Sequence, residues 1–229
     1  LKFMKGPSTV KVIGHYAFSR CHHLKSVEIS DRIEKVGKCA FYHCFALRNL
    51  VLPAHAQSLQ CFETGCYDLL KLFGSNEMIY DLLKSRFDGL TIHKLCYYQS
   101  YYTTETAIEQ IKTVIGESGK GTTPNDKQDC LGMTPLHILA CSTKQNIDLY
   151  QLIVGASPNS LITDDKLGSL PILYAIWSDA PKEIIKFLID SQKSAFPNHV
   201  YDWDQMIKSS CRSGVPQDTI QLLLDTRQA

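Results

Sequence analysis

The chain has 229 residues, of which 44% are hydrophobic and 21% charged, the composition of an ordinary globular protein. Its 24 basic and 23 acidic residues leave a formal net charge of +1, so bulk electrostatics give no attraction to nucleic acid or anionic lipid. The apolar runs fall far short of the roughly 18 residues of a transmembrane helix, and nothing resembles a signal peptide. We therefore expect neither nucleic-acid binding nor membrane insertion.

The nine cysteines are odd in number and spread along the whole chain. Complete pairing within the chain is impossible, and a disulfide scaffold typically concentrates its cysteines in a short secreted domain. We favour buried thiols that pack as small hydrophobic groups, with a disulfide scaffold as the alternative.

Residues 1–73 contain an internal repeat. Shifting "VIGHYAFSRCHHLKSVEIS" by 23 residues superposes it on "KVGKCAFYHCFALRNLVLP", and every matched position is apolar, Gly or Cys. The matched pairs are Ile13–Val36, Gly14–Gly37, Ala17–Ala40, Phe18–Phe41, Cys21–Cys44, Leu24–Leu47, Val27–Leu50 and Ile29–Leu52. The alternating ends of "LxxVxI" and "LxxLxL" predict one short strand per repeat.

The same offset places Leu1 under Leu24 and Met4 under Val27, so the sequence begins inside a repeat and we expect further repeats before it. A weaker third copy, shifted by 22 residues, contains Cys66, Leu69 and Leu72 but has lost the Gly and Ala-Phe positions. Such degeneration is typical of a terminal, capping repeat.

These motifs resemble the BspA-like leucine-rich repeat, whose unit reads roughly "IGxxAFxxCxxLxxVxIP". The resemblance implies a right-handed solenoid with a concave sheet, in which Cys21 and Cys44 point inward and stack on one another. His22, His23 and His43 do not repeat, so we expect them on outward loops, and Cys39 aligns with Tyr16. Because four zinc ligands must converge within about 2.0–2.3 Å of the ion, a zinc site is the less favoured interpretation.

Residues 74–88 follow the leucine-rich copies. Asn76 is a plausible helix cap, apolar residues recur at helical spacing, and Gly89 fits a helix stop. We interpret this segment as a capping helix that joins the first array to a second one.

The second array, residues 89–229, repeats with an offset of 36. "DCLGMTPLHILACS" (129–142) and "DKLGSLPILYAIWS" (165–178) superpose Asp129 on Asp165, Gly132 on Gly168 and Pro135 on Pro171. A second helical pattern follows each, over 146–154 and 181–190. This order resembles the ankyrin repeat, and "TPLH" (134–137) is the motif of that family.

The "TPLH" motif has a physical basis. Pro135 suits the first helical turn, Thr134 can cap the helix, and the His137 ring can return a hydrogen bond to the turn. In the next copy Leu170 and Leu173 replace Thr and His, so packing has to substitute for those bonds.

Degenerate copies flank the two clear ones. "GLTIHKLCYY" (89–98), one residue shorter than the "TPLH" segment, is followed by a helical pattern over 104–115. At the other end, helical patterns over 203–214 and 216–225 form a fourth pair, after an irregular insertion, "SQKSAFPNHVYDWD". The predicted fold is therefore α/β plus all-α: a leucine-rich repeat solenoid packed end-on against about four ankyrin-type helix pairs.

Two segments only superficially suggest chemistry. "GESGKGTT" (116–123) lacks the first Gly and the final Ser or Thr of a phosphate-binding loop and follows a helix rather than a strand. The pairs His93–Cys96 and His137–Cys141 could suggest a nucleophile beside its base. The repeat pattern already accounts for both residues of each pair, so we predict no catalytic residues, metal or cofactor.

The tyrosine cluster Tyr97, Tyr98, Tyr101 and Tyr102 is the most distinctive candidate surface, because tyrosines are enriched at binding hot spots. A nucleic-acid stacking platform would need a cationic groove, and no Lys or Arg lies between Lys94 and Lys112. We expect two of the four rings to pack internally and the others to contact a protein.

The favoured function is a non-enzymatic, monomeric scaffold for protein partners, since both repeat types present variable residues on a regular frame. The alternative is a regulatory arm of an enzyme whose catalytic domain lies elsewhere. We expect a cytoplasmic or nuclear location, with the cell exterior second. The candidate partner-binding residues are Ser26, Glu28, Asn49 and Val51 on the strands, Tyr98 and Tyr101 in the tyrosine cluster, and Lys127, Gln128, Asp164 and Lys166 on the turns.

Overall fold

The computed structural model divides the chain into two compact units, Leu1–Leu83 and Lys84–Ala229, which are described separately. The structure describes residues 3–7, 9–19, 21, 24–37, 40–41, 44, 47, 49–51, 86–99, 102–117, 127–129, 131–142, 144–166, 168–212 and 215–228. The weak third leucine-rich copy and most of the predicted capping helix lie outside these residues. The end-on packing of the two arrays stays a prediction.

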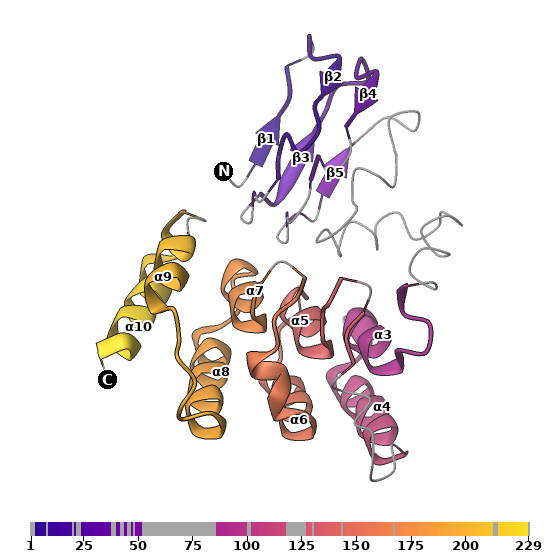
Figure 1. Ribbon diagram of the computed structural model, residues 1–229. Coiled ribbons are helices and arrows are strands. Elements are labelled where there is room, and N and C mark those ends of the chain that lie inside the picture. The colour runs from indigo at the N-terminus through magenta and orange to yellow at the C-terminus, as the bar shows by residue number, and fades with distance from the viewer. Residues whose placement is uncertain are drawn as a thin grey trace. The chain divides into compact units, whose positions relative to one another are not determined.

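The first unit contains two sheets, each made of parallel strands (Figure 1). One sheet has the order β1–β3–β5, and the other pairs β2 with β4. The strands are β1 (Phe3–Lys5), β2 (Val12–Ile13), β3 (Ser26–Glu28), β4 (Lys35–Val36) and β5 (Asn49–Val51). Each repeat thus supplies one strand to each sheet, so the prediction of a single strand per repeat was wrong.

The strand register confirms the 23-residue repeat. Met4 pairs with Val27, and Val27 in turn pairs with Leu50, as the sequence offset predicts. In the second sheet Ile13 pairs with Val36 by the same offset. A shift of one residue would have turned the buried side chains outward, so the periodic apolar pattern specifies this register.

The core between the sheets is built from the matched positions. Phe18 and Phe41 stack with ring centroids 5.3 Å apart and planes 9° from parallel. Cys44 is fully buried, and its thiol donates a hydrogen bond of 2.9 Å to the Phe18 carbonyl of the preceding coil. Its counterpart Cys21, predicted to be equally inward, is only half-buried.

Two exposed ion pairs join equivalent positions of successive coils. Lys5 and Glu28 lie 3.1 Å apart, and Lys11 and Glu34 lie 2.8 Å apart. Equal charges at these positions would repel one another at the spacing of neighbouring strands. Alternating signs therefore suit a stacked repeat, although exposed pairs contribute little stability.

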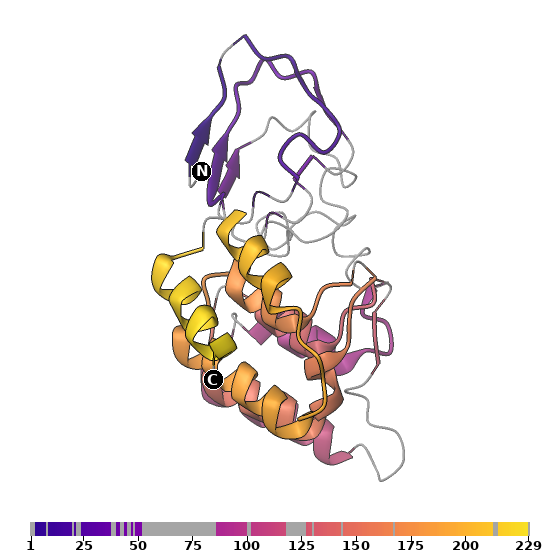
Figure 2. The same cartoon turned by 60° about the vertical axis from the view of Figure 1, so that its left-hand side comes forward.

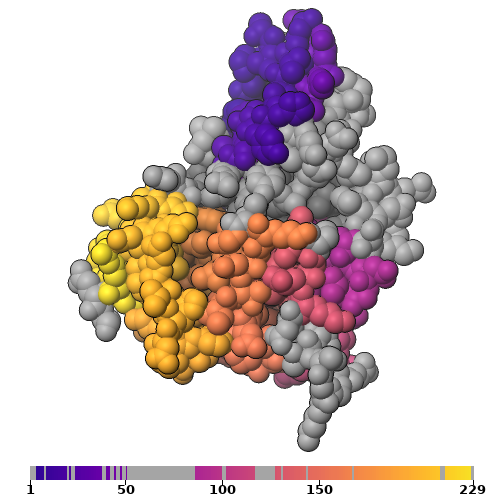
Figure 3. Space-filling view, in the orientation of Figure 1, coloured from indigo at the N-terminus to yellow at the C-terminus, as the bar shows by residue number. Residues whose placement is uncertain are grey.

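The second unit consists of paired helices (Figures 1 and 2). Inner helices α3, α5 and α7 pack against one another in order, and outer helices α4, α6 and α8 do the same. In the space-filling view the pairs form adjacent bands of surface, from magenta to yellow (Figure 3). The helices are α3 (Thr91–Tyr98), α4 (Thr104–Glu117), α5 (Pro135–Ala140), α6 (Ile147–Ala156), the 3-10 helix η5 (Pro158–Ile162), α7 (Pro171–Trp177), α8 (Lys182–Ala195), α9 (Trp203–Arg212) and α10 (Gln217–Gln228).

The helix starts follow the predicted signals. Pro135 and Pro171 occupy the first turns of α5 and α7, where a missing N–H costs nothing. Asn146 caps α6 by accepting hydrogen bonds from the Asp148 and Leu149 amides, at 2.9 and 3.3 Å. Among the described residues, no helix is both long and apolar enough to cross a bilayer.

Helix α8 is longer than predicted, because the first residues of the supposed insertion continue it to Ala195. Gln192 is buried there and donates to the Leu161 carbonyl at 3.2 Å. Lys193 donates to the Thr226 carbonyl of α10 at 3.0 Å. These tertiary contacts, invisible to local periodicity, hold the extra helical turn.

Replacing Gly37 with Ala should destabilise the first unit, whereas replacing its counterpart Gly14 should not. A Cβ at Gly37 would lie 2.5 Å from the His15 amide nitrogen and 2.6 Å from the Gly14 carbonyl carbon, whereas one at Gly14 meets nothing within 4 Å. Overpacking of this kind costs about 1–3 kcal/mol. Amide hydrogen exchange of residues 12–36 should therefore accelerate at least roughly five-fold in Gly37→Ala. Equal exchange in the two variants would contradict the close contact between coils.

Candidate interaction surface of the helical unit

Two turns precede the inner helices α5 and α7, and we call them turn A (residues 127–134) and turn B (residues 163–170). In turn A, the Asp129 amide donates to the Met133 carbonyl at 2.9 Å, and the Asp129 carboxylate accepts the Leu131 and Met133 amides at 2.8 and 3.0 Å. In turn B, Asp165 likewise accepts the Ser169 amide at 2.9 Å. The two matched aspartates therefore hold their own turns closed.

Glycine is needed in each turn for a backbone reason. Gly132 and Gly168 have φ of +77° and +71°, in the left-handed region that other residues occupy only at a cost. At Gly132 the neighbouring turn also comes close, since a Cβ there would lie 2.7 Å from the Lys166 amide nitrogen. That amide donates to the Leu131 carbonyl at 3.0 Å, which joins turn B to turn A.

The "TPLH" bonds form as predicted. Thr134 is the N-cap of α5, and its amide donates to His137 Nδ1 at 3.1 Å. The Thr134 hydroxyl lies 2.8 Å from the same nitrogen. Because Nδ1 accepts, the ring proton is on Nε2, which points away from the turn.

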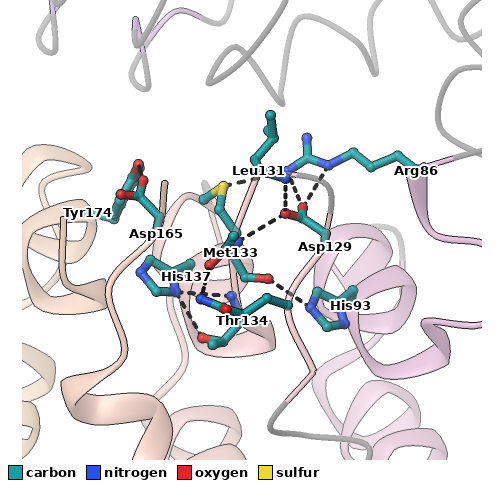
Figure 4. Close-up of polar contacts among 11 residues, drawn as sticks. Arg86, His93, Asp129, Leu131, Met133, Thr134, His137, Asp165 and Tyr174 are labelled. Atoms are coloured by element: carbon teal, nitrogen blue, oxygen red, sulfur yellow. Dashed lines mark hydrogen bonds and ion pairs between the residues drawn. The ribbon is translucent and has the colours of Figure 1, made fainter. Parts of the chain in front are cut away.

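Buried histidines link successive helix pairs (Figure 4). His137 Nε2 lies 3.0 Å from the Ser169 carbonyl in turn B, and His93 Nε2 lies 2.9 Å from the Met133 carbonyl in turn A. Ser169 and Met133 both immediately precede the N-cap of the next inner helix. The two bonds are therefore the same contact, made twice along the array.

Burial keeps both histidines neutral near pH 7. Loss of solvation lowers the pKa of His137 to about 4, and the Ser169 carbonyl and the carboxylates of Asp165 and Asp129 offset only part of this effect. Burial also lowers the pKa of His93, against the Met133 carbonyl and Asp129. A neutral ring suits the geometry, because His137 Nδ1 can accept the Thr134 amide only when it carries no proton.

The second carboxylate oxygen of each matched aspartate takes a donor from elsewhere. Asp129 Oδ2 accepts Arg86 Nε at 2.8 Å and Nη2 at 2.5 Å, and the side chains of the pair are 0% and 9% exposed. Asp165 Oδ2 accepts the Tyr174 hydroxyl. One acid is thus compensated by a cation and the other by a neutral donor (Figure 4).

The predicted turn residues lie at the surface, with one distinction. Lys127, Gln128, Asp164 and Lys166 are all exposed. The Gln128 amide, however, donates to the Gly132 carbonyl at 2.6 Å and to the Asp164 carbonyl at 2.8 Å, so it bridges turns A and B. The charged side chains of the other three extend the exposed edge of the turns.

The predicted strand residues occupy two rows of one sheet. Ser26 lies beside Asn49, and Glu28 lies beside Val51, in the β3–β5 pairing. Ser26 and Glu28 are half-buried, and the Glu28 carboxylate pairs with Lys5. The structure brings these four positions together, at a distance in sequence from the turns.

The tyrosine cluster divides between core and surface. Tyr97 is buried and packs on Phe87, with centroids 5.5 Å apart, and edge-on against Tyr98, at 4.9 Å. Tyr98 is half-buried and Tyr102 is 39% exposed. Tyr101 lies outside the described residues.

The cysteine-histidine pairs are part of the packing. Burial raises the pKa of the Cys96 thiol to about 12, which makes it a poor nucleophile, and the neighbouring His93 ring bonds to the next repeat. Cys21, Cys44, Cys96, Cys141 and Cys211 carry reduced thiols. No group of three His, Cys, Asp or Glu residues in the described part of the chain could hold a metal ion. Most of the apparent zinc cluster (His22, His23, Cys39 and His43) and the loop 118–123 lie outside it.

Three polar side chains that organise the array escaped the sequence analysis: Arg86, Gln99 and Tyr174. Gln99 is buried, and its amide donates to the Ser142 hydroxyl and, at 2.8 Å, to the Lys144 carbonyl of the next helix pair. None of the three has an equivalent residue in the other copies. The 36-residue comparison marked only Asp129 and Asp165, the acceptors of Arg86 and Tyr174.

The paired turn glycines offer a matched test of how closely the turns pack. Gly132→Ala and Gly168→Ala should both lose about 1–2 kcal/mol of unfolding free energy for the left-handed backbone. Gly132→Ala should lose at least about 1 kcal/mol more, because its methyl group would force the Lys166 backbone away. Urea unfolding followed by tryptophan fluorescence reports this unit, since Trp177 and Trp203 both belong to it. Equal losses would show that the turns are not in contact.

The buried His137 should make the helical unit sensitive to acid. The unfolded chain takes up a proton below about pH 6.5, whereas folded His137 stays neutral down to about pH 4. The unfolded state therefore binds more protons in this window, and the free energy of unfolding should fall by about 3 kcal/mol as the pH drops through it. In His137→Gln the protein should be less stable at pH 7.5 but lose less stability on acidification.

The control for this test is His15→Gln, an exposed substitution in the other unit. It should leave the pH dependence of the tryptophan-detected unfolding unchanged. A His137→Gln protein with the full acid sensitivity of the parent would assign the effect to other groups.

Comparison with known protein families finds a match for two parts of the chain. Residues 1–100 match the model of the BspA type leucine rich repeat region, with six copies, and residues 131–164 match that of the ankyrin repeat. No curated protein matches the chain, and no solved structure does. The strand pairing at 23 residues and the "TPLH" bonds agree with these matches. The chain combines a BspA-type leucine-rich repeat region with an ankyrin repeat that follows it.

Proposed function

We propose that this chain is a non-enzymatic scaffold that binds protein partners through its turns and through its three-stranded sheet. Leucine-rich and ankyrin repeats are generally protein-interaction domains and typically lack catalytic activity. The proposal adds which surfaces of this chain serve that purpose.

The observation that carries it is how the polar side chains of the helical unit divide. His93, His137 and Asp129 are buried and bonded to backbone groups within and between repeats. At the same edge, Lys127 and Lys166 are exposed. The buried groups build the frame and the exposed charges vary along it, which is the arrangement of a recognition surface on a rigid scaffold.

The sheet offers a second surface. Ser26 and Asn49 form one row and Glu28 and Val51 the next, on strands whose Val27 and Leu50 side chains are buried on the opposite face. Parallel rows of small, polar and acidic residues at fixed spacing suit an extended segment of a partner. We propose the turns and this sheet as two separate contact surfaces.

The test compares affinity capture from an extract of the source cell by the parent chain and by two variants. The turn variant carries Lys127→Glu, Asp164→Lys and Lys166→Glu, and the sheet variant carries Ser26→Arg and Asn49→Arg. Quantitative mass spectrometry should show at least one captured protein whose recovery falls about ten-fold or more with one variant, since charge reversal at an interface costs on the order of 1.4 kcal/mol or more.

The control variant carries Lys112→Glu, Lys186→Glu and Asp190→Lys. It makes the same charge changes as the turn variant, but on the exposed faces of α4 and α8. It should capture the same proteins as the parent chain. If every captured protein is recovered equally with the turn, sheet and control variants, neither surface binds and the proposal fails.

A further inference from the structure

Neither family match assigns the helix pair of α3 and α4 to the ankyrin array. The leucine-rich match runs to residue 100, through α3, and the ankyrin match begins at residue 131. The chain nevertheless divides between Leu83 and Lys84, so α3 and α4 belong to the helical unit. We propose that residues 86–117 are the first ankyrin-type repeat, in which the Arg86 side chain replaces the missing turn. This assignment is independent of the proposed function.

The helix packing is the first support. Helix α3 packs on α5 and α4 packs on α6, in the same way that α5 packs on α7 and α6 on α8. At the far end of the interface, Gln99 after α3 donates to Ser142 and Lys144 after α5. The Lys144 ammonium returns a bond of 2.9 Å to the Tyr102 carbonyl. The first pair is thus joined to the second at both helix ends.

The histidine bond is the second support. His93 is the third residue of α3, as His137 is of α5, and each ring contacts the carbonyl that precedes the next inner helix. The leucine-rich repeat pattern does not account for a buried histidine that bonds to the turn of an ankyrin repeat. The bond spans 40 residues in sequence, so it follows from the repeat and not from local chain geometry.

The turn before α3 is where the first repeat differs. Gly89 also has a positive φ, +66° against +77° at Gly132, but it lies one residue before the N-cap of its helix rather than two, which locates the residue missing from the "TPLH" comparison. The N-cap is Leu90, whose amide donates to the Phe87 carbonyl instead of to the histidine. His93 Nδ1 accordingly receives no hydrogen bond from the amide of its own N-cap residue.

Arg86 supplies the contact that this shortened turn cannot make. Turns A and B are joined by the Lys166 amide and by the Gln128 side chain. Towards turn A, Arg86 instead reaches Asp129 with two N–H groups and lies 3.5 Å from the Met133 sulfur. A guanidinium is long and forked, so it can span a gap that a shorter backbone turn leaves.

Hydrogen exchange of the full chain tests the assignment. Arg86→Met leaves the buried Asp129 charge uncompensated, which should accelerate exchange in α3, α4 and turn A by roughly a hundred-fold while residues 24–36 keep the parent rate. Arg86→Met combined with Asp129→Asn should recover part of the protection, because no unpaired charge then remains. Arg86→Lys, which keeps the charge, serves if Arg86→Met does not fold.

Two controls separate the alternatives. Arg227→Met removes the exposed pair with Asp204, whose atoms are 2.8 Å apart, and should change exchange in α9 and α10 by no more than about five-fold. Gly37→Ala loosens the leucine-rich coils and should leave α3 and α4 protected. If Gly37→Ala exposes α3 to exchange while Arg86→Met does not, α3 belongs to the leucine-rich array and the proposal is wrong.

Discussion

The hydrogen bond from a buried histidine to a backbone carbonyl of the next repeat fixes how the helix pairs stack. At His137 the ring is neutral, with one nitrogen accepting from its own turn and the other donating onward, and burial supplies that neutrality by disfavouring the charged form. The carbonyl that receives it also accepts an amide of its own turn. One side chain therefore couples the closure of a turn to the spacing between repeats, and together these determine where the helices lie.

The two halves of the chain set the spacing between their repeats with different chemical groups. In the leucine-rich coils, strand hydrogen bonds set the spacing, and side chains such as Phe18 and Cys44 fill the space that the backbone leaves. In the helical unit each helix satisfies its own backbone, so the turns and the side chains set the spacing. That difference explains why the first half carries its signal in apolar and glycine positions, and the second half in Asp, His and Pro.

The sequence predicted the features that recur in successive repeats and missed the contacts that occur only once. Two aligned copies sufficed for the register of Val27 with Leu50 and for the paired turn glycines, because both features recur in each copy, whereas the Thr134–His137 bonds were predicted from the "TPLH" motif itself. Arg86, Gln99 and Tyr174 act once each, so no comparison of copies could mark them. The length of α8 was missed for a related reason, since its last turn is held by α10 and η5 rather than by its own pattern.

The buried aspartates show why the end of the array differs from its interior. Asp165 has its Oδ2 served by Tyr174, a residue of the helix that directly follows its own turn, so that turn completes its bonds within one repeat. Asp129 has Ile138 at the position matching Tyr174, and no hydroxyl is available there. Its carboxylate must therefore take a donor from the preceding repeat, and a fully buried charge is best met by an opposite one with directed N–H groups. Arg86 thus supplies the donor that Ile138 cannot.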